Sequence, residues 1–366
     1  MHLADIAPSI FSTLGVPDSD NRMNIDSSPS GRECLFLIDG LGASVINEYR
    51  DLLPSLSSMH SYSPLQSSFP TTTATALATL TTGQLPGVHG MLGYTVRVPR
   101  SGGRILNALK WDERVDPENW QPVETLFQKA ERSGISVSHV AAKRYENSGF
   151  TRAAFRGAQY KGANILTDLV DETKKALRES PSFAYIYIND LDVAGHSDGV
   201  GSQKWLDALA YVELLTRSLI SNLPKGTRLW LTADHGMINT DEKITMGENN
   251  PLLDGVELIA GEPRARHLYL PVDQLGNSSH VAQTWRDFLG ERADIYTQQE
   301  AIDAGLFGDV LTADARDRMG DILAIAKGNV VLIEAGRKEL ESAMVGHHGG
   351  LTDAEKLIPL LSCETN

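Results

Sequence analysis

The sequence predicts an α/β fold with parallel strands, on the basis of three apolar runs. Cys34–Ile38, Ser182–Ile188 and Arg228–Thr232 are continuous apolar stretches, typical of strands buried on both faces. Each run is followed within a few residues by an acidic side chain, and segments with helical spacing separate the runs. Ligand sites in open α/β sheets gather at the carboxyl ends of parallel strands. The acidic side chains therefore mark one edge of the sheet as the candidate site.

Length and charge limit the classes of function. The 366 residues suffice for one large α/β domain or two ordinary ones, and 41% hydrophobic and 22% charged residues are ordinary for a globular protein. The net charge of −14, from 33 basic and 47 acidic residues, argues against binding to nucleic acid polymers or to anionic membranes. A nucleotide substrate stays open, because bound metal ions can invert the charge of the site itself.

The chain has two cysteines, Cys34 and Cys363. We expect Cys34 in the core and Cys363 in a C-terminal tail, and so few cysteines favour a reducing compartment without a disulfide framework. The first residues lack the basic and apolar regions of a signal peptide, and no apolar run is long enough to span a membrane. A cytoplasmic location is therefore the expectation.

The domain boundaries follow from composition. Residues 1–31 are expected to be an N-terminal segment and linker, because Asp18–Gly31 is rich in Ser, Asp and Asn. Residues 32–366 are expected to form the catalytic domain. Asp39 ends the first strand in a glycine turn, and a helix is expected over Ala43–Leu53. Seen alone, Asp39 is as well explained by a helix cap.

The stretch Ser67–Gly93 organises the rest of the chain. Its Phe69-Pro70 pair cannot sit inside a helix, the Thr/Ala run that follows has helical spacing, and Gly83 is a plausible C-terminal cap. Thr73 then falls near the helix start, where backbone N–H groups can face an anion. Its hydroxyl is well placed to attack phosphorus. Threonine also caps helices, so this role depends on the other motifs.

The remaining elements are read from local patterns. Residues 94–122 are irregular and are expected to form a loop or small lid beside the site. Helices are expected over 123–133, 162–179, 202–219, 281–289 and 298–304, and strands over 135–140, 258–259, 267–270, 322–326 and 330–333, the last two as a hairpin or strand pair. Thr352 to Glu355 is a capping box that opens a short helix.

Carboxylates and imidazoles recur in the motifs after the strands and near the C-terminus. The candidates are Asp39, Asp192, His196, Asp234, His235 and His348. A set without thiolate suits zinc, and manganese or iron where carboxylates dominate. Six ligands suffice for two metals, which can hold both oxygens of an in-line displacement at phosphorus. His89 is expected to hydrogen-bond its own turn. The other histidines lack ligand spacing: His2, His60, His139, His267 and His280.

In this order, the motifs LFLIDG, FPTTTA, NDLDVAGH, TADHGM and GHHGG resemble the nucleotide pyrophosphatase/phosphodiesterase family of the alkaline phosphatase superfamily. The GYTVRVP segment is similar to that of its actinobacterial-type members. The resemblance covers about residues 33–360. It implies an alkaline phosphatase-like three-layer αβα sandwich with a mostly parallel central sheet and a small lid or cap insertion. It also implies two divalent metal ions, with Zn²⁺ favoured over Mn²⁺ or Fe.

The resemblance assigns roles to the candidates. One metal would be bound by Asp39, Asp234 and His235, with Thr73 bridging toward substrate, and the other by Asp192, His196 and His348. The family's nucleophile is the third residue after the proline, which selects Thr73 over Thr71 and Thr72. The family's last ligand directly precedes a glycine, which selects His348 over His347.

One position departs from the family. Other members place an asparagine after the glycine turn to contact a phosphate oxygen, whereas this chain has Gly93-Tyr94-Thr95. The Tyr94 hydroxyl or the backbone N–H of Ala74 is expected to take this role.

Together these features imply a hydrolase that cleaves phosphodiester or pyrophosphate bonds of small, nucleotide-like substrates through a phosphothreonine intermediate. A phosphomonoesterase or phosphonate hydrolase of the same fold is the alternative; the lack of an arginine beside Thr73 favours the diester. A sulfatase would need Cys or Ser at that position. A non-catalytic metal-binding protein would have no use for the hydroxyl. The physiological substrate and the oligomeric state do not follow from the sequence.

Overall fold

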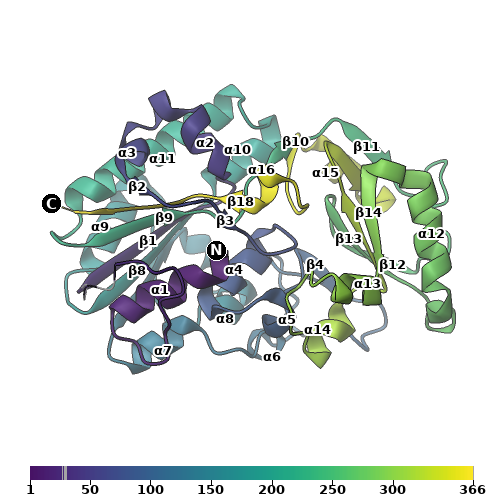
Figure 1. Cartoon of the computed structure of the whole chain (residues 1–366), viewed down its shortest axis with the longest axis horizontal. Coiled ribbons are helices and arrows are strands. Elements are labelled where there is room, and N and C mark those ends of the chain that lie inside the picture. The colour runs from purple at the N-terminus through teal and green to yellow at the C-terminus, as the bar shows by residue number, and fades with distance from the viewer. Residues whose placement is uncertain (27, 29–30, 366) are drawn as a thin grey trace.

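The computed structural model describes residues 1–26, 28 and 31–365, which fold into two lobes (Figure 1). The main lobe surrounds a seven-stranded sheet. The second lobe, residues 240–345, is inserted between β10 (Ile238–Asn239) and β17 (Gly346–His347), which pair antiparallel. The chain thus leaves and re-enters the main lobe at one place. Within the described residues, the helices are all too short or too polar to cross a bilayer.

The central sheet is mostly parallel, as predicted. Its strands, in spatial order, are β2 (His60–Ser61), β19 (Leu360–Glu364), β9 (Arg228–Thr232), β1 (Arg32–Ile38), β8 (Ser182–Ile188), β6 (Ser136–Ala141) and β7 (Gln159–Gly162). The strands from β9 to β7 are parallel, and β19 runs antiparallel to β9. Ile38 lies opposite Ile188, and Leu37 lies opposite Thr232. The residues that follow these three strands therefore meet at one edge.

Helices cover both faces of this sheet, which confirms the three-layer arrangement (Figure 1). One layer contains α1 (Ile6–Thr13), α4 (Thr73–Thr82), α7 (Leu126–Arg132) and α8 (Gly149–Ala154). The other contains α2 (Ala43–Glu48), α3 (Pro54–Ser58), α9 (Leu166–Ala176), α10 (Asp190–Asp198) and α11 (Gln203–Asn222). Gly83 ends α4 with a positive φ of 65°, as its predicted role as a cap requires.

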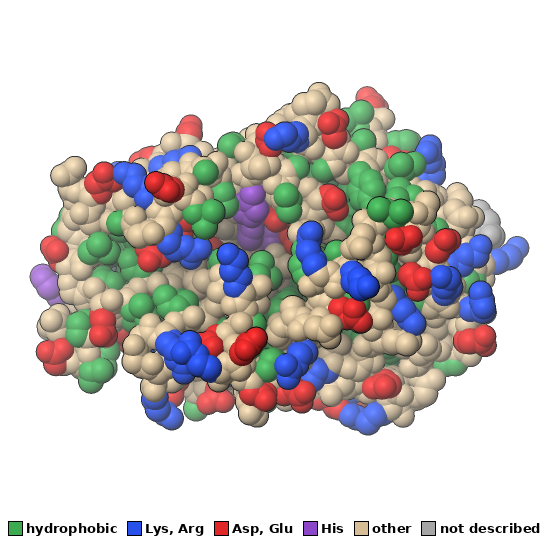
Figure 2. Space-filling view, turned by 180° about the vertical axis from the view of Figure 1, so that it is seen from behind, with side chains coloured by type: hydrophobic (Ala, Val, Ile, Leu, Met, Phe, Trp, Pro, Cys, Tyr) green, Lys and Arg blue, Asp and Glu red, His purple; other side chains and the backbone are tan. Residues whose placement is uncertain are grey.

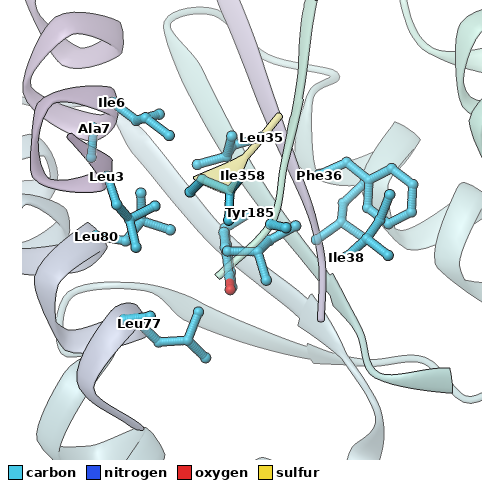
Figure 3. Close-up of a cluster of buried hydrophobic side chains, with 14 of the residues drawn as sticks. Leu3, Ile6, Ala7, Leu35, Phe36, Ile38, Leu77, Leu80, Tyr185 and Ile358 are labelled. Carbon is cyan, nitrogen blue, oxygen red and sulfur yellow. The ribbon is translucent and has the colours of Figure 1, made fainter. Parts of the chain in front are cut away.

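The N-terminal residues are part of the main core. Figure 3 shows Leu3 and Ile6 beside Leu80 of α4, facing Leu35 and Tyr185 of the sheet. All five side chains are buried in one cluster. Residues 1–31, expected as a segment and linker, therefore contribute a helix to the layer that also carries Thr73. Of the loop expected over 18–31, residues 27, 29 and 30 lie outside the described residues.

The second lobe is built on a four-stranded antiparallel sheet. Its strands, in spatial order, are β12 (Leu258–Glu262), β13 (Ala265–Tyr269), β15 (Ile322–Ala326) and β14 (Ala293–Thr297). Helix α12 (Ser278–Leu289) covers one face over a core of its own, which includes Trp285. Side chains on the other face, such as Leu323 and Ile325, join the core of the main lobe. The two lobes are thus packed together rather than merely linked.

Two local predictions are wrong. Strands β15 and β16 (Val330–Ile333) exist but do not form a hairpin, because β13 and β14 occupy both edges of β15 and β16 pairs in parallel with β11 (Glu242–Thr245). The helix expected over Ala43–Leu53 ends at Glu48, because Tyr49 leaves helical geometry with φ −111° and ψ 31°. A 3₁₀ turn over Arg50–Leu52 follows, and Pro54 starts α3.

Other segments are more ordered than expected. Residues 94–122 contain a hairpin of β4 (Thr95–Arg97) and β5 (Ile105–Asn107) and the short helix α6 (Pro117–Trp120). Cys363 lies in β19 rather than in a tail, whereas Cys34 is buried as predicted. The remaining predicted helices are present as α13 (Gln298–Asp303) and α16 (Asp353–Lys356), the latter with its capping box.

A buried ion pair ties the second lobe to the loop after β17. The Arg264 guanidinium, in the β12–β13 turn, donates to both carboxylate oxygens of Glu355 at 3.0 and 2.8 Å. Both side chains are fully buried. Glu355 also accepts the backbone N–H of Gly350 at 2.8 Å. This one carboxylate therefore holds the turn of one lobe against a loop of the other.

We expect Glu355→Gln to lower the free energy of unfolding by about 3–5 kcal/mol, because it leaves the Arg264 charge buried without a counter-charge. The measurement is the urea midpoint of the full chain. Asp317→Asn is the matched control, because it removes the carboxylate of an exposed pair with Arg100 and should cost about 1 kcal/mol or less. Equal losses of unfolding free energy in the two variants would show that the buried ion pair stabilises the fold no more than the exposed pair does.

Candidate functional site

The predicted candidates converge at the carboxyl edge of the central sheet. Asp39 directly follows β1, and Asp234 and His235 follow β9. Asp192 and His196 stand four residues apart on α10, so that both side chains leave the same face of the helix. The helix itself was not predicted, although this spacing of four is its signal in the sequence.

The six ligand candidates form two groups, and within each group the ligand atoms lie within 4.8 Å of one another. In the first group, His235 Nε2 is 3.4 Å from Asp39 Oδ1 and 3.5 Å from Asp234 Oδ2. In the second group, the Nε2 atoms of His196 and His348 are 3.1 Å apart. Asp192 Oδ1 is 3.5 Å from His196 Nε2 and 3.7 Å from His348 Nε2. The grouping is the one implied by the family resemblance.

Backbone carbonyls fix the orientation of the three imidazoles. Nδ1 of His196 donates to Gly346 O at 2.8 Å, Nδ1 of His348 to Thr71 O at 2.8 Å, and Nδ1 of His235 to Gly236 O at 3.0 Å. Since a carbonyl can only accept, each Nδ1 carries the proton and each Nε2 presents a lone pair to the site. This second contact is the usual way in which a protein orients a metal-binding histidine.

The carboxylates of Asp39, Asp192 and Asp234 are buried, and no lysine or arginine in the described part of the chain forms an ion pair with them. Burial and the neighbouring carboxylates of Asp234 and Asp192 raise the pKa of Asp39 well above its ordinary value. Burial also raises the pKa of Asp234. Among the described residues, Asp39 Oδ1, Asp192 Oδ1 and Asp234 Oδ2 have no hydrogen-bond partner. These are the same atoms that face the Nε2 lone pairs.

This arrangement fits two divalent cations. The first group offers two carboxylate oxygens and one imidazole, and the second group offers one carboxylate oxygen and two imidazoles. Donor sets of this kind are used for zinc, manganese or iron. Burial and the neighbouring imidazoles lower the pKa of His348 well below its ordinary value, so its ring stays neutral and able to ligate. Cations would satisfy the three unpartnered carboxylate oxygens and offset their mutual repulsion.

Thr73 is the first residue of α4, and its hydroxyl faces the first group. Thr73 Oγ1 lies 3.4 Å from Asp39 Oδ2 and 3.3 Å from His235 Nε2. The Tyr187 hydroxyl also donates to Asp39 Oδ2. The start of a ten-residue helix leaves backbone N–H groups without partners inside the helix, and such groups favour an anion.

The neighbouring threonines and His347 are absent from both ligand groups, and Thr71 and His347 make other contacts among the described residues. The Thr71 hydroxyl donates to Gly350 O at 2.8 Å, and Thr72 is the N-cap position of α4. His347 Nδ1 lies 2.8 Å from the Thr240 hydroxyl. His89 accepts the Met91 N–H at 3.1 Å on Nδ1, which confirms its predicted contact with its own turn.

The site opens into a cleft of about 410 Å³ between the lobes. Thr73, Asp192, His196 and His348 line it from the main lobe. Residues 261–263 and parts of 337–344 line it from the second lobe. Figure 2, which views the molecule from behind relative to Figure 1, shows imidazole side chains at the bottom of a hollow in the middle of the surface. A volume of this size is that of a small-molecule site.

Both predicted substrate contacts, Ala74 and Tyr94, line this cleft. Sequence reasoning missed other lining residues, of which Asn189 and Glu262 are the most informative. Asn189 directly precedes α10 and accepts from Arg144 at 3.3 Å. Its place between a strand end and Asp192 was a signal in the sequence. Glu262 comes from the second lobe, and no local pattern marked it.

Comparison with solved structures shows the same fold. Murine ectonucleotide pyrophosphatase/phosphodiesterase 5 superposes with a TM-score of 0.69 at 15% identity, over 90% of this chain and 87% of that one. An inactive threonine-to-alanine variant of the murine protein, in complex with AMP, gives a TM-score of 0.67 at 14% identity, over 91% and 87%.

Sequence comparisons identify the family. Human ectonucleotide pyrophosphatase/phosphodiesterase family member 1 is 25% identical over 241 residues, or 61% of this chain and 26% of that protein. Mouse family member 3 is 25% identical over 265 residues, or 65% of this chain and 29% of that protein. The chain thus spans less than a third of the length of these relatives. The family model described as type I phosphodiesterase / nucleotide pyrophosphatase matches residues 34–351. This chain therefore belongs to the type I phosphodiesterase/nucleotide pyrophosphatase family.

Proposed function

We propose that this protein is a metal-dependent hydrolase that cleaves phosphodiester or pyrophosphate bonds of nucleotide-like substrates, with Thr73 as the nucleophile. One observation carries the proposal: the Thr73 hydroxyl lies against Asp39 and His235 at the floor of a cleft that the second ligand group also lines. The AMP complex of a structural relative supports a nucleotide as the substrate class.

Asp39, Asp234 and His235 are proposed to hold one divalent cation, and Asp192, His196 and His348 a second, with zinc favoured by the imidazole content. When bound, the two cations would neutralise charge on the phosphoryl oxygens and lower the pKa of the attacking hydroxyl. Free Cys34 and Cys363 support a cytoplasmic location. They flank Leu229 on the two neighbouring strands, too far apart for a disulfide.

The protein's own residues position the reacting atoms. Asp39 Oδ2 accepts from the Thr73 and Tyr187 hydroxyls and so orients Oγ1 toward the cleft. The Oγ–P bond forms as the P–O bond to the leaving group breaks, and the proton lost by the hydroxyl is matched by one that the leaving oxygen gains. Water then cleaves the phosphothreonine and restores the hydroxyl. The N-terminal N–H groups of α4 stabilise the phosphoryl charge in both steps.

Thr73→Ala should lower hydrolysis of a p-nitrophenyl nucleotide diester by about three orders of magnitude or more, whereas Thr73→Ser should retain measurable activity because it keeps a hydroxyl. Release of p-nitrophenol with added Zn²⁺ and with chelator is the measurement. The simple monoester, p-nitrophenyl phosphate, is run alongside. A preference for the monoester would favour a phosphatase of the same fold, and activity untouched in Thr73→Ala would exclude Thr73 as nucleophile.

Metal content tests the ligand sets without an activity assay. The wild-type protein should bind two metal ions per chain, and Asp234→Asn or Asp192→Asn should each lower this number to one, because each removes a charged ligand of a different group. Elemental analysis after dialysis gives the number and the identity of the metal. Asp190→Asn is the matched control, because this aspartate is exposed two residues before Asp192 on the same helix. Equal losses in Asp190→Asn and Asp192→Asn would contradict the ligand assignment.

Glu262 is a buried acid in the wall of the cleft. Its side chain is 5% exposed, Oε2 accepts the Tyr94 N–H at 3.0 Å, and Oε1 has no partner in the described part of the chain. Burial raises its pKa from the ordinary 4.5 to about 8, against smaller opposing effects of the Tyr94 N–H and then of the Arg266 charge. The group is therefore protonated at neutral pH in the folded protein.

The pH dependence of stability follows from this shift. Between pH 4.5 and about 8 the folded state holds a proton that the unfolded chain releases, so the free energy of unfolding falls as the pH rises and levels off above pH 8. Glu262→Gln keeps the acceptor for Tyr94 and cannot ionise. Its thermal midpoint should therefore rise relative to wild type across this window, since all other groups are shared. A variant that loses stability relative to wild type as the pH rises would contradict the assignment.

A further inference from the structure

A separate cavity, here called the N-terminal pocket, lies between the two lobes. Its volume is about 570 Å³, and none of its described lining residues lines the catalytic cleft. Residues 304–308, which follow α13 in the second lobe, form one wall. Most of the remaining wall comes from parts of residues 2–5, from residues 66–69 before α4 and from residues 83–86 after it. Ligand pockets of this size often lie at the border between domains.

Contacts between the lobes hold this pocket in shape. The rings of Phe69 and Phe307, one from each lobe, pack with centroids 5.3 Å apart, and both side chains are buried. The Gly87 N–H donates to Phe307 O at 2.8 Å. A Cβ atom at Gly308 would lie 2.8 Å from the Leu85 side chain, and the φ of this glycine is 101°. The wall from the second lobe is therefore packed closely against the main lobe, and the pocket is preformed.

Apolar side chains from both lobes supply much of the lining. They are Phe69, Leu85, Pro86, Leu306, Phe307 and Leu351. Aromatic side chains favour stacked or edge-on contact with another ring. A ligand with a flat ring would therefore find matching partners here.

Four polar side chains of the lining have N–H groups to spare. The Arg22 guanidinium donates to Gly83 O at 3.0 Å, which uses one of its five N–H groups. Gln84 directly follows Gly83, so its carboxamide and the guanidinium share one end of the pocket. Neither Gln66 nor Gln84 has a side-chain hydrogen bond to another described residue. Lys356 adds a second cation.

The charges of the pocket suit an anion. The described residues that line it include two cations, Arg22 and Lys356, and one carboxylate, Asp5. Asp5 is engaged already, because Oδ2 accepts the His2 N–H at 2.9 Å and Oδ1 lies 4.0 Å from Arg22 Nη1. Lys356 pairs at 3.0 Å with Asp353, which lies outside the pocket and is 78% exposed. An exposed pair of this kind is weak and can be exchanged for a ligand.

Three kinds of group therefore converge in one preformed cavity. A guanidinium binds phosphate through two parallel N–H donors. A glutamine carboxamide can both donate to and accept from the edge of an adenine base. Aromatic rings can hold the face of such a base. A nucleoside monophosphate combines an anion, a flat ring and a polar ring edge in one molecule of suitable size.

We propose that the N-terminal pocket is a second binding site, whose ligand is a nucleoside monophosphate. The phosphate lies at Arg22 and Gln84, and the base lies against Phe69 and Phe307. The site adjoins the segment that carries the proposed nucleophile, because residues 66–69 line this pocket and residues 72–74 line the cleft.

Calorimetric titration of the zinc-loaded Thr73→Ala chain tests this site, because turnover does not interfere there. AMP is the probe, with adenosine and inorganic phosphate run separately. We expect one AMP in the N-terminal pocket in addition to any in the cleft. Adenosine and inorganic phosphate should bind the N-terminal pocket roughly tenfold or more weakly than AMP, since each lacks one half of the ligand. Absence of AMP binding would overturn the proposal.

Substitutions identify which cavity binds AMP. Arg22→Gln, in the Thr73→Ala background, should weaken one AMP site roughly tenfold or more, because it removes a charged partner of the phosphate. Arg100→Gln is the matched control, because Arg100 is also paired with an aspartate but lies outside the pocket and is 87% exposed. It should leave the titration unchanged. AMP binding that is the same in Arg22→Gln as in this control would overturn the proposal.

A second variant covers the case in which Arg22→Gln does not fold. Gln84 is half-buried and has no side-chain hydrogen bond to lose, so Gln84→Trp should fill its end of the pocket without leaving a partner unpaired. It should abolish the same AMP site, and an unchanged titration would exclude this pocket. Hydrolysis in the cleft is not required for this binding. The titration therefore decides the proposal even if the chain hydrolyses no phosphodiester.

Discussion

Three carboxylates, Asp39, Asp192 and Asp234, are buried side by side where the central strands end, and their oxygens that face the site have no hydrogen-bond partner among the described residues. Negative charges that are buried close together in a low-dielectric interior repel one another strongly. The folded chain can hold them only with protons or with cations. The surrounding architecture places them, with the imidazoles of His196, His235 and His348, where they could hold two divalent metal ions.

The backbone around the site is organised by this requirement. Each imidazole is held by a carbonyl, and the carbonyl for His348 belongs to Thr71, two residues before the proposed nucleophile. The loop that carries His348 also returns a bond from Gly349 to the Thr71 hydroxyl at 3.0 Å. Arg264 and Glu355 attach the second lobe to the same loop. Thr73, the candidate ligand His348 and the far wall of the cleft are therefore joined by one set of hydrogen bonds.

The second lobe also forms part of the cleft wall. It supplies Glu262, Arg337 and Leu340 to the cleft, whereas the described residues that line the adjoining pocket of about 100 Å³ beside Thr73 all come from the main lobe. The family model covers the part of the chain that carries Thr73 and both candidate ligand groups.

Local sequence patterns were enough to predict much of the structure. Three apolar runs identified the central strands, and the acidic residues that follow these runs, together with the helix cap at Gly83, located the site. Such features are carried by neighbouring residues, whose spacing expresses burial and helix geometry directly. The pairing of β15 with β13 and β14, the contact between Tyr94 and Glu262 and the division of the site into two cavities were decided only by the tertiary fold. These features depend on hydrogen bonds and packing between residues that are far apart in the chain. The sequence of one segment does not specify which distant segment will pair with it or pack against it.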